Sequence, residues 1–298
     1  MLFLDESAVA RVLRYDDLIP AIARALTDLS MGRVVQPVRS VVPIAPYHGF
    51  LGAMPAYAGA LGAKLVTFYP RNAGMPTHHA LITLFRPETG EPLAVMDGRL
   101  ITEMRTAAAS AVATNILAAP EAAVLALLGA GVQAHSHLAA LRTVRRFREV
   151  RVWSPRSSAK FAEEHDVTAA ASPEAAVRGA DIVVVATASQ TPVLKGAWLS
   201  PGTHVNAVGA TRPDWRELDD DVVGRARVYV DSREAALKES GDVIAAPGAV
   251  VEIGEALGGT APGRQAPDEL TLFKSVGVAV EDVAAAALVY EAAMRTPS

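Results

Sequence analysis

The apolar positions in the first third of the chain follow two different periods. Residues 16–30 place apolar side chains at helical spacing behind the acidic pair Asp16 and Asp17, which predicts an amphipathic helix. Short runs rich in Val, Ile, Leu, Phe and Tyr follow, and turn sequences such as Asn72-Ala73-Gly74 separate them. Runs of this kind predict an antiparallel sheet. They comprise residues 38–44, 64–69, 80–86 and 93–97.

An alanine-rich segment then predicts a helix over residues 102–118. Thr102 offers an N-terminal cap, and Glu103 places an acid in the first turn, where the helix dipole favours it. Pro120 ends the helix, since proline cannot continue one.

Beyond residue 120 the pattern alternates between short β-rich runs and helical segments. This alternation predicts a parallel sheet with right-handed crossovers. The final apolar stripe, over residues 278–295, predicts a last amphipathic helix. The predicted parallel strands are residues 124–128, 150–153, 181–187, 204–208 and 227–231.

A glycine-rich turn joins the first predicted parallel strand to the helix that follows it. Gly129 permits the tight turn, Gly131 lets the backbone approach a pyrophosphate, and Ala134 is small enough for helix–strand packing. The helix start adds unpaired N–H groups that favour phosphate. The loop therefore predicts a dinucleotide site, although an ordinary strand–helix turn is the alternative. The predicted cofactor contacts are Gly129, Ala130, Gly131, Val132 and Gln133.

The end of the second parallel strand indicates which dinucleotide is used. An NAD site usually places a carboxylate there, yet no acid follows Trp153 until Glu163. Ser154, Arg156 and Ser157 could hold a 2′-phosphate instead. We therefore expect NADPH, with NADH as a possible cofactor and a solvated Arg156 as the alternative.

Length, composition and charge narrow the protein class. The chain has 298 residues, enough for two domains, and 51% of them are hydrophobic. Acidic residues number 32 and basic residues 28, so nothing indicates a nucleic-acid or membrane partner. The absence of cysteine excludes disulfides and a cysteine nucleophile. With no basic, apolar leader and no membrane-length apolar stretch, we expect a cytoplasmic protein.

Eight segments, in order over nearly the whole chain, resemble the ornithine cyclodeaminase/mu-crystallin family, most closely its mu-crystallin branch. They are residues 36–39, 51–57, 64–69, 93–98, 105–108, 205–218, 234–242 and 272–277, together with the glycine loop.

The resemblance implies an α/β fold in which a Rossmann dinucleotide-binding domain is inserted into an α+β domain that binds substrate and mediates dimerisation. The inserted domain would comprise residues 119–277. The second would comprise residues 1–118 and 278–298, with the last helix packed back on the N-terminal sheet. A homodimer that binds a nicotinamide cofactor and a small imino or amino acid is expected.

The resemblance also proposes a carboxylate clamp. Arg39, Lys64 and Arg105 match the family's positions for this role, and two guanidinium groups with one ammonium suit a carboxylate ligand. For any one of them, a structural or solvated ion pair is the alternative. Lys64 and Arg105 are the expected catalytic residues, and Met54 and Thr211 the further substrate contacts.

Two departures from the family pattern point to reduction rather than cyclodeamination. Cyclodeaminases carry acidic residues where this chain has Gly52 and Thr211, and that reaction needs a carboxylate to take a proton. We expect hydride transfer to the C=N carbon of a cyclic imino acid, giving an L-amino acid, with Lys64 or an ordered water supplying the proton. The alternatives are an NAD(P)-dependent amino-acid dehydrogenase acting on an oxo acid plus ammonia, a cyclodeaminase, and a non-catalytic carboxylate carrier.

The resemblance, with the position of strand ends, adds weaker cofactor contacts. A metal site is not expected: His78 and His79 are adjacent on a strand and point to opposite faces. Asp219 to Asp221 look like a solvated helix start, and His135 and His137 like structural or surface groups. The additional cofactor contacts are Thr77, His78, His79, Arg105, Thr106, Thr187, Ala188, Ser189, Val208, Lys274 and Ser275.

Overall fold

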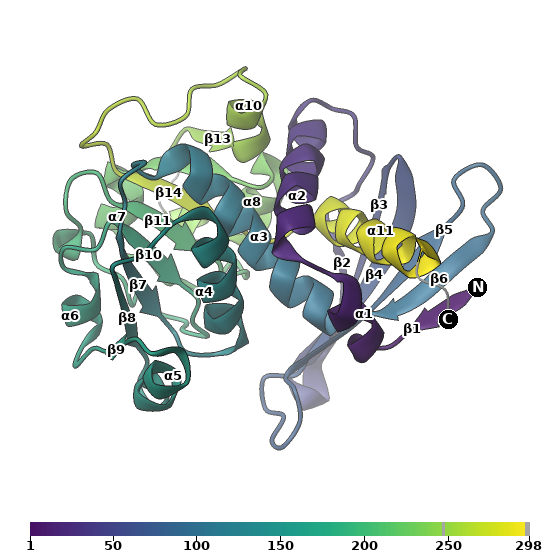
Figure 1. Ribbon diagram of the computed structural model, residues 1–298, viewed down its shortest axis with the longest axis horizontal. Helices are drawn as coiled ribbons and strands as arrows, with labels where there is room; N and C mark the ends of the chain where they lie inside the picture. Colours follow the sequence, from purple (N-terminus) through teal and green to yellow (C-terminus); the bar gives the residue numbers. More distant parts are fainter. Residues whose placement is uncertain (246–247, 296–298) are drawn as a thin grey trace. The chain divides into compact units, whose positions relative to one another are not determined.

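A computed structural model describes residues 1–245 and 248–295 (Figure 1). The chain divides into two compact units. The first comprises Met1–Arg105 and Gly277–Ser298, and the second comprises Thr106–Val276. The chain thus leaves the first unit and later returns to it. Within the described residues, no helix combines the length and apolarity needed to cross a membrane.

The first unit is built on a six-stranded sheet with the order β1-β6-β5-β4-β3-β2. Strands β2 to β6 pair antiparallel, as predicted, and β1 adds a parallel edge beside β6. The bounds are β1 Leu2–Leu4, β2 Ser40–Ile44, β3 Gly49–Ala58, β4 Ala60–Phe68, β5 His78–Phe85 and β6 Pro92–Asp97.

Sequence patterning missed β1 and β3. The sequence of β3 contains Gly49, Gly52 and Pro55, residue types that are depleted in strands. Its neighbours β2 and β4 pair with it on both sides, so long-range hydrogen bonds outweigh this weak local preference.

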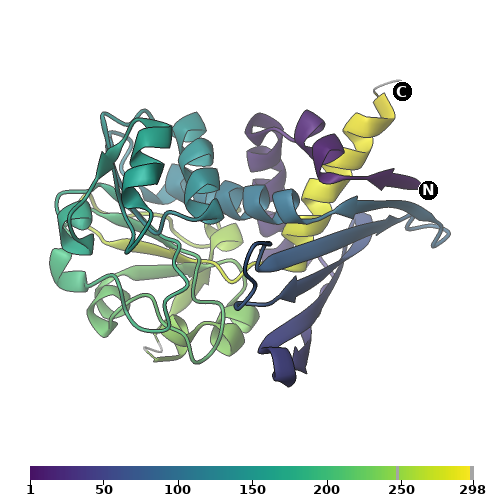
Figure 2. The same ribbon diagram turned by 90° about the horizontal axis from the view of Figure 1, so that it is seen from below.

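Helices cover one face of this sheet. Helix α11 (Ala279–Arg295) packs on β3, β4 and β5 and against α2 (Tyr15–Ser30), so the last helix does return to the N-terminal sheet (Figures 1 and 2). Helix α1 (Glu6–Val12), capped by Asp5, and the short 3₁₀ helix η1 (Ala45–Tyr47) complete the unit.

Helix α3 (Arg99–Leu117) begins one turn before the predicted start. The side chain of Asp97 accepts a hydrogen bond from the Arg99 N–H, while Thr102 is buried inside the helix. The prediction of Thr102 as the cap was therefore wrong, because Asp97, five positions before the predicted start, supplies the acceptor. The boundary between the units falls inside α3, after Arg105, whereas the sequence-based boundary was placed at the end of the helix.

The second unit carries an eight-stranded, all-parallel sheet with the order β13-β12-β14-β11-β10-β7-β8-β9. The order reverses between β7 and β10, as in doubly wound Rossmann folds. Every residue of β7, β10, β11 and β14 is buried. The bounds are β7 Val124–Leu128, β8 Glu149–Trp153, β9 Thr168–Ala169, β10 Ile182–Val185, β11 His204–Ala207, β12 Arg227–Val230, β13 Val250–Glu252 and β14 Thr271–Lys274.

The helices of the second unit supply the layers that bury this sheet. On one face, alternate strand residues form an aliphatic core with side chains of α6 and α7. On the other, Asn206 of β11 donates a hydrogen bond to Thr114 of α3 at 3.0 Å. The bounds are α4 Val132–Val144, α5 Ser158–His165, α6 Pro173–Val177, η2 Gly196–Trp198, α7 Asp220–Arg225, α8 Arg233–Glu239, α9 Gly241–Ala245 and α10 Ile253–Leu257.

Candidate functional site

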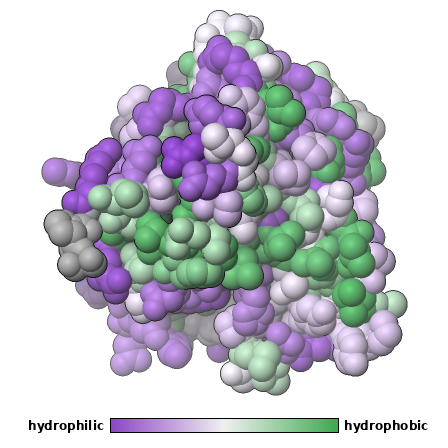
Figure 3. Space-filling model, turned by 90° about the vertical axis from the view of Figure 1, so that its right-hand side faces the viewer, coloured by the Kyte–Doolittle hydropathy of each residue, from purple (hydrophilic) through white to green (hydrophobic). Residues whose placement is uncertain are grey.

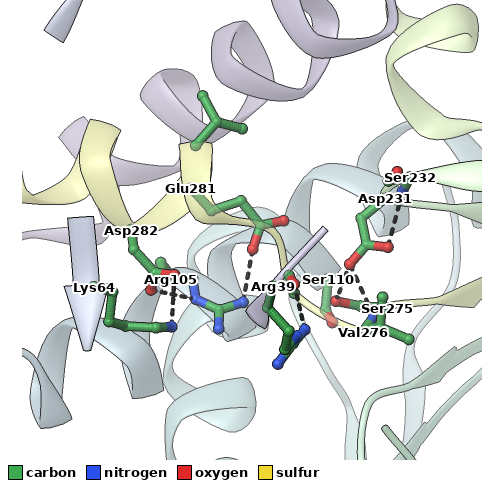
Figure 4. Close-up of polar contacts among 12 residues, drawn as sticks. Arg39, Lys64, Arg105, Ser110, Asp231, Ser232, Ser275, Val276, Glu281 and Asp282 are labelled. Carbon is green, nitrogen blue, oxygen red and sulfur yellow. Dashed lines mark hydrogen bonds and ion pairs between the residues drawn. The ribbon is translucent and has the colours of Figure 1, made fainter. Parts of the chain in front are cut away.

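The predicted clamp residues Arg39, Lys64 and Arg105 lie together in the first unit (Figure 4). Lys64 projects from the helix-covered face of β4, Arg105 from α3, and Arg39 directly precedes β2. Lys64 and Arg105 are 2% and 5% exposed, so their charges are withdrawn from water. Such burial is rare for cations unless they are paired.

Two acids at the start of α11 hold these cations. Asp282 accepts from both, with Lys64 Nζ 2.6 Å from its Oδ2 and Arg105 Nε 2.9 Å from its Oδ1. Glu281 Oε2 accepts from Arg105 Nη1 at 2.7 Å. Both carboxylates are fully buried. We call Arg39, Lys64, Arg105, Glu281 and Asp282 the basic cluster.

The basic cluster brings three cations together with two carboxylates. Burial lowers the pKa of Lys64 to about 8, although Asp282 partly opposes this effect. Burial alone would raise the pKa of Asp282, but Arg105 and Lys64 outweigh it and hold that pKa below its ordinary value. Three cationic side chains thus lie around two carboxylates, with Lys64 and Arg105 buried and Arg39 half-buried, and charge interactions are strong where water is largely excluded.

Gly277 fixes the backbone beside the cluster. Its carbonyl accepts from Arg39 Nη2 at 2.8 Å, and its φ of +78° is one that residues with a side chain rarely adopt. A Cβ at this position would lie 2.6 Å from the guanidinium of Arg105. Glycine here lets the chain pass close to the clamp as it enters α11.

Met54, His78 and His79 lie on strands of the same sheet, and Thr77 directly precedes β5. Met54 is buried on β3 opposite Lys64 in the strand register. His78 shares the helix-covered face of β5, and burial, reinforced by Lys64 and Arg105, lowers its pKa to about 4. His79 and Thr77 are exposed, so the two histidines face opposite ways as predicted.

The glycine loop of the second unit has the conformation that a dinucleotide turn requires. Gly129 has φ +107°, and a Cβ there would lie 2.3 Å from the carbonyl oxygen of Ala186. A Cβ on Gly131 would meet nothing within 4 Å, which leaves open space in front of the α4 start. Gly131 is the N-cap of α4 and provides no side-chain cap. Ala134 is buried against the sheet, as its small size allows.

Two neighbouring features suit a bound dinucleotide. The side-chain oxygen of Gln133 is buried and has no hydrogen-bond partner among the described residues. Arg156 is exposed after β8, and within the described part of the chain no hydrogen bond or ion pair engages it. Ser154 and Ser157 flank it, half-buried. An unsatisfied buried acceptor and an available guanidinium fit NAD(P)H at this loop.

Glu217 organises the loops after β10 and β11. Its carboxylate accepts from the N–H and hydroxyl of Thr187 and from the N–H of Gly209, at 3.0 to 3.3 Å. Burial raises its pKa to about 7. Sequence reasoning missed this residue, because a lone acid among polar neighbours is typical of a solvated loop. The predicted contacts Thr187, Ala188, Ser189 and Val208 lie in these loops, and Thr211 follows in the second.

The predicted contacts at the end of β14 are engaged inside the second unit. Lys274 is fully buried, with its ammonium 3.2 Å from Asp242. Ser275 donates to Asp231, which also accepts from the Val276 N–H (Figure 4). Thr106 is buried in α3. Asp219 caps α7, which confirms the helix-start interpretation of the acidic run.

Comparison with known proteins matches these features to one family. The sequence profile of the ornithine cyclodeaminase/mu-crystallin family matches residues 1–296. The ketimine reductase mu-crystallin of Mus musculus is 48% identical, over 97% of this chain and 96% of that protein.

Two solved structures share the fold over 99% of this chain. The Thermococcus litoralis Δ1-pyrroline-2-carboxylate reductase, in complex with NADH and L-proline, has a TM-score of 0.96 and 39% identity, with 98% of that chain covered. An archaeal alanine dehydrogenase dimer with bound NAD has a TM-score of 0.93 and 35% identity, with 96% of that chain covered. The chain belongs to the ornithine cyclodeaminase/mu-crystallin family.

Proposed function

We propose that this protein uses NAD(P)H to reduce the C=N bond of a small, cyclic imino acid to the corresponding L-amino acid. The observation that carries the proposal is the basic cluster, which gathers the half-buried Arg39 with the buried Lys64 and Arg105, in a chain that also has a dinucleotide loop. The mouse and Thermococcus relatives are named for reductions of this kind, which supports it.

The cluster residues would bind and orient the substrate. Arg39, Lys64 and Arg105 would pair with the substrate carboxylate, because guanidinium and ammonium groups match its charge and geometry. Asp282 and Glu281 position Lys64 and Arg105 before substrate arrives, so little ordering is needed on binding. When bound, the dinucleotide would supply a hydride to the imine carbon.

The imine nitrogen must also gain a proton. Lys64 is a candidate donor, since burial brings its pKa to about 8 and makes its ammonium more acidic than an ordinary lysine. Asp282 remains ionised beside it and stabilises the charged form. An ordered water is the other candidate. His78 is a poor donor because its pKa of about 4 leaves it neutral.

The residues at the dinucleotide loop favour NADPH over NADH. The exposed guanidinium of Arg156, with Ser154 and Ser157 beside it, could bind a 2′-phosphate, and no carboxylate precedes Glu163 to accept from a 2′-hydroxyl. The two solved relatives contain NADH or NAD. A preference of this protein for NADPH would therefore come from its own loop around Arg156. Arg156→Asp should shift selectivity toward NADH, and unchanged selectivity would remove Arg156 from the site.

We further propose a homodimer formed through the sheet face that the helices leave uncovered. Alternate residues of β3, β4 and β5 place Leu51, Tyr57, Leu65 and Leu81 on that face, each 37% to 52% exposed. A band of hydrophobic residues crosses the face of the molecule shown in Figure 3. Exposed apolar patches usually mark interfaces, and the archaeal alanine dehydrogenase is described as a dimer. Sedimentation of Leu65→Asp should show monomers if a second copy binds there.

The reaction is tested by following NADPH and NADH oxidation with Δ1-piperideine-2-carboxylate and Δ1-pyrroline-2-carboxylate. Fast oxidation with either imine supports the proposal. Pyruvate with ammonia tests the second candidate, an amino-acid dehydrogenase, which the 35% identity to alanine dehydrogenase favours. Turnover with pyruvate and ammonia, but with neither imine, would replace the imine proposal. Cofactor binding without turnover of any of these substrates would favour a non-catalytic carboxylate carrier.

A further inference from the structure

A group of potential metal ligands lies on the second unit, among residues that the proposed reaction does not use. His135 is near the start of α4, and Glu164 and His165 are at the end of α5. One ligand atom from each of the three lies within 4.8 Å of the other two.

The two imidazoles already point their nitrogens at one another. His135 Nδ1 and His165 Nε2 are 2.6 Å apart, so only one of them can carry a proton between the rings. Phe161 holds both rings in place, with centroids 4.6 Å from His135 and 4.5 Å from His165. Both histidines are half-buried and Glu164 is exposed, which leaves a route for an ion from solvent.

Glu164 has one competing partner at the site. Lys160 is paired with Glu164 at 3.6 Å, and both side chains are largely exposed. An exposed pair of this kind contributes little stability, so an ion can displace it at small cost.

We propose that His135, Glu164 and His165 bind a divalent transition-metal ion of the zinc class, with water completing the coordination. Imidazole and carboxylate suit zinc, which takes tetrahedral sites with Zn–N distances of about 2.0–2.1 Å. Two nitrogens of a tetrahedral site are then roughly 3.3 Å apart. The two rings therefore need to separate by less than about 1 Å, a change that side-chain rotation allows.

Such an ion would tie α4 to α5. Helix α4 begins at the glycine loop and α5 follows the Arg156 loop, so the ion would link the two segments that flank the proposed dinucleotide contacts. It would displace the proton shared by the two histidines, and it would stabilise the second unit by binding only its folded form.

The experiment is zinc titration of chelator-treated protein by calorimetry, with thermal unfolding followed alongside. We expect one zinc per chain and a rise in Tm. His135→Asn and His165→Asn should each weaken binding at least tenfold, and Glu164→Gln should weaken it by less. Glu163→Gln removes the adjacent exposed acid of α5 and is the matched control, with unchanged affinity expected.

Cobalt gives a second readout that does not depend on stability or enzyme activity. Bound in place of zinc, it should show the intense visible absorption of a four-coordinate ion, and this should disappear in His165→Asn. Circular dichroism establishes that each variant is folded. Zinc affinity that is equal in the wild type and both folded histidine variants would overturn the proposal, as would the absence of any binding.

Discussion

Replacing Asp282 with asparagine removes a carboxylate that contacts both Lys64 and Arg105 while keeping the side-chain shape. Asp282 Oδ1 would still accept from Arg105, but an amide nitrogen placed at the other position would face the Lys64 ammonium 2.6 Å away. Breaking a buried pair in this way costs about 3–5 kcal/mol, because a charge is left without compensation.

Lys64 can relieve part of that cost by losing its proton. Its pKa is already lowered to about 8, and loss of Asp282 removes the principal interaction that opposes the lowering. The lysine should then be neutral at pH 7 and no longer pair with a substrate carboxylate. We expect the free energy of unfolding to fall by about 2–4 kcal/mol and kcat/KM for the imine to fall by roughly 10²–10³-fold, since each factor of ten is about 1.4 kcal/mol.

The assays are urea unfolding and steady-state imine reduction, with NADPH affinity as an internal reference. NADPH affinity should be nearly unchanged, since Asp282 belongs to the first unit and the glycine loop to the second. Glu291→Gln is the matched control, an exposed acid on the same helix whose loss should change stability by less than about 1 kcal/mol. Wild-type stability and KM in Asp282→Asn would refute the assigned role of the basic cluster.

Four further predictions concern the basic cluster and the glycine loop. Affinity for a planar carboxylate inhibitor, such as pyrrole-2-carboxylate, should fall as pH rises through about 8, because Lys64 loses its charge there; a flat profile between about pH 6.5 and 9.5 would contradict this. The sign for stability is opposite: between pH 8 and 10.5 the unfolded lysine holds a proton that the native one lacks, so the contribution of Lys64 to the free energy of unfolding rises with pH. Arg105→Lys keeps the positive charge but loses the guanidinium group that contacts two carboxylates. The loss of transition-state stabilisation, calculated from the fall in kcat/KM, should be about 2–5 kcal/mol. Unchanged kinetics would show that the charge alone suffices. Gly129→Ala should lower the Tm because its Cβ would meet Ala186, whereas Gly131→Ala should keep the Tm and weaken NADPH binding measured by fluorescence; equal Tm values in the two variants would argue against this loop geometry.

Local pattern was sufficient for much of the fold. The strand, glycine loop and helix around Gly129 were predicted because their sequence signals are contiguous, and the parallel sheet followed from alternating periods. Strand β14 was also missing from the prediction, and the reason is the same as for β3. β14 is only Thr271–Lys274, and it becomes a strand by pairing between β11 and β12, which lie far from it in sequence. Strand propensity is weak beside such long-range pairing.

The residues of the basic cluster were likewise only partly predictable from the sequence. The basic residues Arg39, Lys64 and Arg105 were found through resemblance at their own positions, but Glu281 and Asp282 look like an ordinary acidic first turn of an alanine-rich helix. Asp282 meets Arg105 across 177 residues only because α11 returns to pack on β3, β4 and β5. The sequence by itself determined the periodicities, the glycine turn and the supply of cations, since these depend on neighbouring residues. Only the tertiary structure decided which carboxylates are buried against those cations, because the cost of burying charge is met by partners that folding brings from distant parts of the chain.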